Sequence, residues 1–412
     1  MRRAVYGVTA VTLLSYAGEY MAFTSILAWL DVLLLNNGYS TLQAFGFGYL
    51  ASSAYLVFSG VLAVPLGSLA DLFGRRATAA VGCVLAGLAI FAVSLTGSIS
   101  GATTIIISMS LLLLLIGVGH ATYTTSALAY AGDVSSEQDV GEAYGLVETA
   151  EYTMFMFGTP LGFALAQAFG NQSTFYITGA ILLAGALAAM VGMPERRTTV
   201  PSSATFDASH QTSNPSRWAL LYRAVSDREV QVSLLAIFFV SVGFTMFRVY
   251  LTQYGNNASP SLVVGPYVVS IMALASVLAA VPIGRLVDVT KKRGVIMAAG
   301  FLVEGAALAL IFFQPSALSL IVWSVIFGVA IMLVRVPQAV VVAERTVHEN
   351  RATAMGTNHG IEHVGYGVGA FLGGALLLFL GFTTLETFWF VAGLSLAFGI
   401  ALFPIIRELK MA

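Results

Sequence analysis

Twelve apolar stretches, each long enough to cross a lipid bilayer as an α-helix, run through this chain. They lie near 5–34, 42–70, 77–97, 102–132, 139–168, 173–193, 230–254, 263–287, 294–314, 317–343, 352–380 and 384–405. Barrel strands would instead give alternating segments of about 10 residues. Only 9% of the residues are charged, against about 25% in a soluble domain. We therefore predict an all-α integral membrane protein with 12 transmembrane helices.

The basic residues lie on one side of these stretches. All but two of the 19 Lys and Arg residues fall at the termini or on alternate connections. The intervening connections, at 36–41, 97–103, 170–174, 255–261 and 315–317, contain no Lys or Arg. Because cytoplasmic loops are enriched in Lys and Arg, we expect both termini to be cytoplasmic and the chain to lie in the cell membrane.

One long polar segment interrupts the apolar pattern after the sixth stretch. It is rich in Ser, Thr, Arg and Asp and is typical of a flexible linker. We predict an N-terminal six-helix bundle at 1–193, a cytoplasmic linker at 194–229 and a C-terminal six-helix bundle at 230–412.

The two halves of the sequence are related to each other. The segment Ala63–Asp71 reads AVPLGSLAD, and Ala280–Asp288 reads AVPIGRLVD. Further on, Gly145, Glu151, Gly158, Gly162 and Gly170 correspond to Gly356, Glu362, Gly369, Gly373 and Gly381. Two matches in the same order predict a duplicated six-helix unit, an architecture of transporters in which the site lies between the repeats.

A short motif follows the second apolar stretch and recurs in the second half. The first copy reads Gly67-x3-Asp71-x2-Gly74-Arg75-Arg76, and the second reads Gly284-x3-Asp288-x2-Lys291-Lys292-Arg293. Both resemble the signature loop of the major facilitator superfamily, with Lys291 where the family prefers Gly. With the helix count, the linker and the repeat, the resemblance covers the whole chain. It implies two pseudo-symmetric bundles that rock about a central site.

The motif residues also have a direct physical interpretation. Asp71 at a helix end can meet the positive N-terminus of another helix, and Arg75 can pair with Asp133. The resemblance implies a latch that closes the cytoplasmic side when the transporter opens outward. Its residues would be Gly67, Asp71, Gly74, Arg75, Asp133, Gly284, Asp288, Arg293 and Glu344. The alternative is that these charges only set the topology.

Ionisable residues inside apolar stretches are rare and usually functional, so they are the candidates for the site. In the superfamily the first, fourth, seventh and tenth helices line the cavity, and the second, fifth, eighth and eleventh flank it. The expected substrate-binding residues are Arg335, Arg248, Tyr123, Thr124, His120 and Tyr20. The expected proton-coupling residues are Glu19, Glu151, Glu362, Glu148 and His359.

Three interpretations of these residues remain open. The arginines could bind an anionic group of the substrate through the guanidinium fork, while the glutamates carry protons. Each arginine could instead be neutralised by an internal glutamate, in salt bridges that break as the halves rock. The residues could also be structural fixtures, although fully buried ion pairs contribute little to stability.

The function expected from these observations is secondary active transport of a small polar, anionic organic solute such as a carboxylate, coupled to protons. The alternative is a proton/drug antiporter in which Glu19 binds both proton and drug. Drug antiporters of the superfamily tend to carry Gly-Pro-x-x-Gly-Gly in the fifth helix, whereas this chain has Gly158-Thr159-Pro160-Leu161-Gly162-Phe163. A third class is a non-transporting receptor on the same fold.

The sequence gives no sign of other chemistry. It contains no phosphate-binding loop and no nucleophile motif, so we expect neither an enzyme nor ATP-driven transport. We expect no cofactor and, because no spaced cluster of metal ligands is evident, no metal. The expected partners are a small-molecule substrate, protons and the lipid bilayer, with no nucleic acid and a monomeric protein.

Overall fold

The structure, a computed structural model, describes residues 2–39, 41–136, 139–194, 226–258, 264–313, 317–346, 351–378 and 384–409. Within these ranges it contains α-helices, one short 3-10 helix (η1, Ser94–Ser98) and no strand. The first half forms α1 (Arg2–Asn36), α2 (Thr41–Phe73), α3 (Arg75–Val93), α4 (Ala102–Val134), α5 (Val140–Phe169) and α6 (Asn171–Gly192). The second half forms α8 (Arg228–Ala258), α9 (Val264–Thr290), α10 (Arg293–Phe313), α11 (Ala317–Arg345), α12 (Arg351–Leu378) and α13 (Thr384–Leu409).

In the described ranges, nine helical segments are long and apolar enough to cross a membrane by length and composition. Neither α5 nor α12 is among them. α5 carries Glu148 and Glu151, and α12 carries His359, Glu362 and His363, and these polar residues lower the mean hydropathy of the two helices. Both helices bring carboxyl or imidazole groups into the interior.

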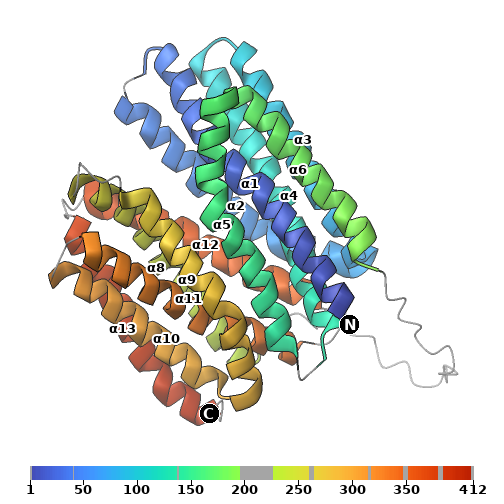
Figure 1. The fold of residues 1–412 in the computed structure, drawn as a ribbon, viewed down its shortest axis with the longest axis vertical. Coiled ribbons are helices and arrows are strands. Elements are labelled where there is room, and N and C mark those ends of the chain that lie inside the picture. Colours follow the sequence, from blue (N-terminus) through green and yellow to red (C-terminus); the bar gives the residue numbers. More distant parts are fainter. Residues whose placement is uncertain are drawn as a thin grey trace, which may run out of the picture.

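The two halves pack their helices in the same pattern. In the first half α1 packs on α5 and α6, and α3 packs on α4 and α6. In the second half α8 packs on α12 and α13, and α10 packs on α11 and α13. Figure 1 shows the halves as two bundles that lie close at the end where both termini lie and diverge toward the opposite end. We call the end of the molecule at which both termini lie the terminal end.

The bundles meet through α2 against α12 and α5 against α9. Glycines allow these helices to approach closely. A Cβ atom on Gly360 would lie 2.5 Å from the carbonyl oxygen of Gly60, and one on Gly284 would lie 2.4 Å from that of Gly141. Such separations exclude any side chain, so these glycines are required by the contact between backbones.

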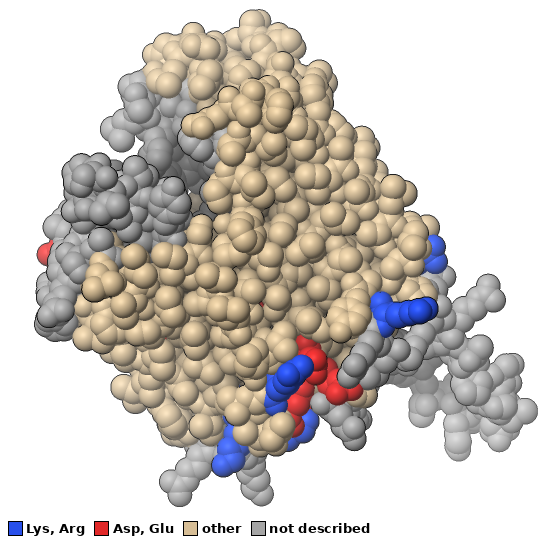
Figure 2. Space-filling view, viewed as in Figure 1, with Lys and Arg blue, Asp and Glu red and all other residues tan. Residues whose placement is uncertain are grey.

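The outer surface matches a membrane environment. Large apolar side chains are exposed along it, among them Val191, Val289 and Leu187. Most Lys, Arg, Asp and Glu side chains visible in Figure 2 gather toward the terminal end, and the rest of that face is formed by other residues. On this face of the molecule, the visible charged side chains therefore lie mainly toward the terminal end.

Candidate substrate and proton site

Arg335 of α11 lies at the centre of the first polar cluster and is 4% exposed. Its Nε donates to Glu148 Oε2 of α5 at 2.9 Å, and its Nη1 donates to Glu362 Oε1 of α12. Nη1 also donates to the Tyr366 hydroxyl at 2.6 Å, and Nη2 lies 3.5 Å from Glu151 Oε2. The guanidinium thus joins the N-terminal bundle to the C-terminal bundle.

The formal charges of this cluster do not balance. Three carboxyl groups, those of Glu148, Glu151 and Glu362, surround the single guanidinium of Arg335. With all four groups ionised, the cluster would carry a net charge of −2 in an interior where charges are poorly solvated. An uncompensated buried charge costs several kcal/mol, on the order of the penalty for breaking a buried ion pair. The arrangement therefore has the capacity to take up protons.

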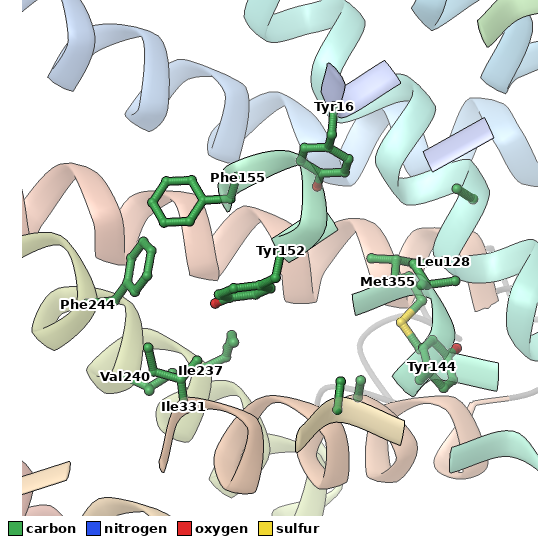
Figure 3. Packing of buried hydrophobic residues seen from close by; sticks show 14 of the residues in the cluster. Tyr16, Leu128, Tyr144, Tyr152, Phe155, Ile237, Val240, Phe244, Ile331 and Met355 are labelled. Carbon is green, nitrogen blue, oxygen red and sulfur yellow. The ribbon is translucent and has the colours of Figure 1, made fainter. Parts of the chain in front are cut away.

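Aromatic residues pack beside the guanidinium. The ring of Tyr152 on α5 lies under Arg335, with 5.4 Å from the guanidinium carbon to the ring centroid. Phe155 of α5 contacts Phe244 of α8 at a centroid separation of 5.7 Å. Figure 3 shows Tyr152, Phe155 and Phe244 turned toward one another between helices of the two bundles. These rings exclude water from this side of the ion pair.

The second polar cluster is built around Glu19 of α1, which is 5% exposed. Its two carboxylate oxygens accept hydrogen bonds from the hydroxyls of Tyr55 on α2 and Tyr123 on α4. His120 Nδ1 of α4 lies 2.6 Å from Glu19 Oε2. These are all groups of the N-terminal bundle, so Glu19 is neutralised or hydrogen-bonded within its own half.

Three histidines connect the two clusters. His120 Nε2 lies 3.2 Å from His363 Nε2 of α12, and His363 Nδ1 lies 2.7 Å from Ser59 Oγ of α2. His359, one turn before His363, has its Nδ1 3.6 Å from Glu362 Oε2. Polar contacts therefore run from Glu19 through His120 to His363, and the ring of His359, 4.0 Å from that of His363 between centroids, lies between these residues and Glu362.

The residues of the signature motif join the bundles at the terminal end. Asp71 Oδ2 of α2 accepts from the backbone N–H of Thr353, in the first turn of α12, at 2.9 Å. Asp288 of α9 accepts from the backbone N–H groups of Gly141 and Glu142, in the first turn of α5, at 3.2 Å and 3.1 Å. The two contacts are equivalent under the repeat. Each places a carboxylate at the positive end of a helix in the other bundle.

Arginines surround these carboxylates. Arg75 Nη2 lies 2.8 Å from Asp71 Oδ1, and its Nε lies 3.1 Å from Asp133 Oδ2. Arg351 Nη1 of α12 lies 3.0 Å from the other oxygen of Asp133, so this carboxylate also bridges the bundles. In the second copy Arg293 Nη2 lies 2.5 Å from Glu344 Oε1.

The backbone conformation explains why the motif has a glycine at position 74. Gly74 has φ 91°, and Lys291 at the repeat-equivalent position has φ 57°. Both lie in the left-handed region, which glycine adopts freely and which costs another residue about 1–2 kcal/mol. The preference of the family for glycine here therefore follows from the turn, and this chain keeps the turn with Lys291.

Most of the predicted site residues come together, and others do not. Glu148, Glu151, Glu362 and Arg335 form one cluster, and Glu19, His120 and Tyr123 form the other. Tyr20 stacks on Tyr16 at 5.4 Å between centroids, outside these ion pairs, and Thr124 is buried on α4. The side chain of Arg248 lies outside the described residues.

Tyr55, Ser59 and Tyr366 were not predicted as partners, because they are ordinary polar residues and no local pattern distinguishes them. The expectation that the chain has no spaced cluster of metal-ligand residues was wrong. One ring nitrogen from each of His120, His359 and His363 lies within 4.8 Å of the others. The spacing of four residues between His359 and His363 was the available signal, because it places both on one helix face.

Comparisons with known proteins agree with this architecture. The Major Facilitator Superfamily matches the chain over residues 8–288 and 234–411. The fold is similar to the crystal structure of the human organic anion transporter MFSD10 (TETRAN), with a TM-score of 0.77 and 16% sequence identity over 97% of this chain and 99% of that chain. The predicted twelve-helix fold in two pseudo-symmetric bundles is thereby confirmed. The chain belongs to the major facilitator superfamily and is a multi-pass membrane protein, a secondary transporter of small solutes and not an enzyme.

Proposed function

We propose that this transporter couples protons to the movement of a small organic anion by alternating access between its two bundles. The observation that carries the proposal is the buried ion pair between Arg335 of α11 and Glu148 of α5. The two residues belong to different bundles, so rocking motions that open a path at this level must separate them. Separation of a buried pair without compensation costs about 3–5 kcal/mol.

A proton can compensate for that separation. When a proton neutralises Glu148, the carboxyl group no longer requires the guanidinium, and the bundles can move apart. Glu151 and Glu362 lie within reach of the same guanidinium and provide further protonatable oxygens. Proton uptake is thus linked to the conformational change by the loss of one ion pair.

An anion can then take the place of the carboxylate. A guanidinium offers planar, paired N–H donors that match a carboxylate or phosphate, so a released Arg335 becomes a binding group for an organic acid. The fold is similar to that of a human organic anion transporter, and this similarity supports an anionic cargo. In this scheme proton uptake precedes anion binding, and the internal glutamates and the substrate compete for one cation.

We further infer that the terminal end is the cytoplasmic end, with the bundles at 1–193 and 230–412 joined by a cytoplasmic linker at 194–229 in a cell-membrane monomer. The one-sided Lys and Arg distribution supports this orientation. The contacts of Asp71 and Asp288 with helix N-termini of the other bundle support a latch that holds this end closed. The structure therefore corresponds to a state closed toward the cytoplasm under this proposal.

A ligand screen tests the proposal. Purified protein is heated with a panel of organic acids, sugars and lipophilic cations at pH 5.5 and pH 7.5, and the unfolding temperature is recorded. An organic acid should stabilise the wild type, more strongly at the lower pH, and should have no effect on Arg335→Gln. Stabilisation of Arg335→Gln equal to that of the wild type would refute the anion site.

Proton/drug antiport is the second candidate, and the surroundings of Glu19 favour it. The carboxylate lies among aromatic rings, including those of Tyr55 and Tyr123, and such a setting suits a lipophilic cation. This function predicts competition between a cationic dye and protons that disappears in Glu19→Gln. If only lipophilic cations stabilise the protein in the screen and Arg335→Gln responds normally, antiport replaces anion transport.

A further inference from the structure

The three clustered histidines carry an inference that is independent of the transported solute. We propose that His120, His359 and His363 form a binding site for a divalent transition-metal ion, with Zn²⁺ as the best match. All three are buried, at 4%, 2% and 5% exposure. One ring nitrogen from each lies within 4.8 Å of the others.

The spacing of the ring nitrogens fits one shared ion. Two imidazole nitrogens that bind one tetrahedral Zn²⁺ at ~2.0–2.1 Å lie about 3.3–3.4 Å apart. His120 Nε2 and His363 Nε2 are separated by 3.2 Å, close to that value. The ring of His359 lies beside both others, with its centroid 4.0 Å from that of His363 and 5.0 Å from that of His120, and one of its nitrogens lies within 4.8 Å of a nitrogen of each.

The other nitrogen of each ring already faces an oxygen atom. Nδ1 of His120 faces Glu19 Oε2 at 2.6 Å, and Nδ1 of His363 faces Ser59 Oγ at 2.7 Å. Nδ1 of His359 faces Glu362 Oε2 at 3.6 Å. Metal-binding histidines characteristically donate their second N–H to a carboxylate or another oxygen, which fixes the tautomer and directs the remaining nitrogen to the metal.

The remaining nitrogens need a partner. Among the described residues, His359 Nε2 is buried without any hydrogen-bond partner. The Nε2 atoms of His120 and His363 face each other, and two neutral rings oriented by their Nδ1–H groups would oppose lone pair to lone pair. A cation between the three nitrogens satisfies all of them. Three imidazole ligands suit Zn²⁺, Cu²⁺, Ni²⁺ or Co²⁺ rather than Mg²⁺ or Ca²⁺, which prefer oxygen.

The site spans the two bundles. His120 belongs to α4, and His359 and His363 belong to α12. A metal bound by all three ties the bundles together, so Zn²⁺ should hold the transporter in the conformation described here.

Metal titration tests this proposal on the full chain after removal of any purification tag. Zn²⁺ should bind the wild type with one saturable site, measured by calorimetry, and should raise its unfolding temperature. Mg²⁺ should do neither. The variants His120→Asn, His359→Asn and His363→Asn should each lose at least about tenfold in Zn²⁺ affinity. Thr357→Ser on the same helix is the control and should bind as the wild type does.

A second measurement protects the test against variants that fail to fold. Co²⁺ added to the wild type should give the strong visible absorption of a tetrahedral nitrogen site, and Zn²⁺ should displace it. Absence of saturable Zn²⁺ binding to the wild type, an octahedral Co²⁺ spectrum, or unchanged Zn²⁺ affinity in folded histidine variants would each overturn the proposal. None of these outcomes depends on whether an organic anion is transported.

Discussion

Arg335 of α11 and Glu148 of α5 form a buried ion pair across the interface between the two bundles, with Nε 2.9 Å from Oε2. Both side chains are about 5% exposed, so water contributes little to their solvation. A contact of this kind links two properties of a transporter, because the charge state of Glu148 and the separation of the bundles cannot change independently.

Removal of the guanidinium should destabilise the protein in a pH-dependent way. Arg335→Gln leaves the carboxyl groups of Glu148, Glu151 and Glu362 close together without a cation, at a cost of about 3–5 kcal/mol when they are ionised. Protonation relieves this repulsion, so the loss in unfolding temperature should be larger at pH 8 than at pH 5.

The control for this prediction is Arg285→Gln. Arg285 pairs with Glu142 at the terminal end, where the two side chains are 65% and 39% exposed. Exposed pairs contribute little to stability, so this variant should unfold near the wild-type temperature at both pH values. An equal, pH-independent loss in the two variants would contradict the assigned role of the buried cluster.

Neutralising the motif carboxylates should open the terminal end. Asp71→Asn and Asp288→Asn remove a charge from the N-termini of α12 and α5, and each such interaction contributes about 0.3–1 kcal/mol, rising to ~2 kcal/mol when partly buried. The distance between spin labels on Cys residues introduced at exposed Leu72 and Val289 should lengthen, in a background with Cys83 replaced by Ala.

Asp227→Asn is the matched control for the latch. Asp227 also accepts from backbone N–H groups at a helix start, those of Glu229 and Val230, but within one bundle. It should leave the label distance unchanged. If the label distance lengthens in Asp227→Asn, or stays unchanged in a variant that combines Asp71→Asn with Asp288→Asn, these carboxylates do not hold the bundles together.

A side chain at a close backbone contact between the bundles should have the same effect as loss of the latch. In Gly284→Val the added Cβ would lie 2.4 Å from the Gly141 carbonyl oxygen, so α9 and α5 must separate. The labels at Leu72 and Val289 should report a longer distance. Gly393→Val on α13, where a Cβ would meet nothing within 4 Å, should retain the wild-type distance. Equal distances in the two variants would contradict the requirement for close packing.

The helical fold was predictable because apolar length and one-sided charge are local properties of the sequence. The predicted stretches overlap the observed helices, with ends that differ by a few residues where helices extend beyond the apolar core, as at Arg2–Asn36. The duplication predicted the equivalent placement of Asp71 and Asp288, because equivalent residues in a repeat occupy equivalent positions. Chain conformation at Lys291 was not predictable, since its left-handed φ of 57° contradicts its residue type.

The partners within the site could not be predicted from the sequence. Arg335 and Glu148 are 187 residues apart, and His120 and His363 are 243 residues apart, so only the packing of the bundles brings them together. Helical position indicated which carboxylates face inward, but not which cation each would meet. Tyr55 and Tyr366 are two of 16 tyrosines, and nothing in the sequence around them separates them from the others.

The coupling role of Glu148 is tested most directly in proteoliposomes with a radiolabelled organic acid that stabilises the wild type. Glu148→Gln carries a permanently neutral side chain, so the bundles can rock without the Arg335–Glu148 ion pair that protons would otherwise break. We expect this variant to exchange labelled for unlabelled solute across the membrane while failing to accumulate solute when a pH gradient is imposed. Glu304 of α10 is a buried residue that belongs to neither polar cluster, so Glu304→Gln serves as the control and should accumulate solute as the wild type does. Accumulation by Glu148→Gln at the wild-type level would contradict proton coupling through the Arg335–Glu148 pair.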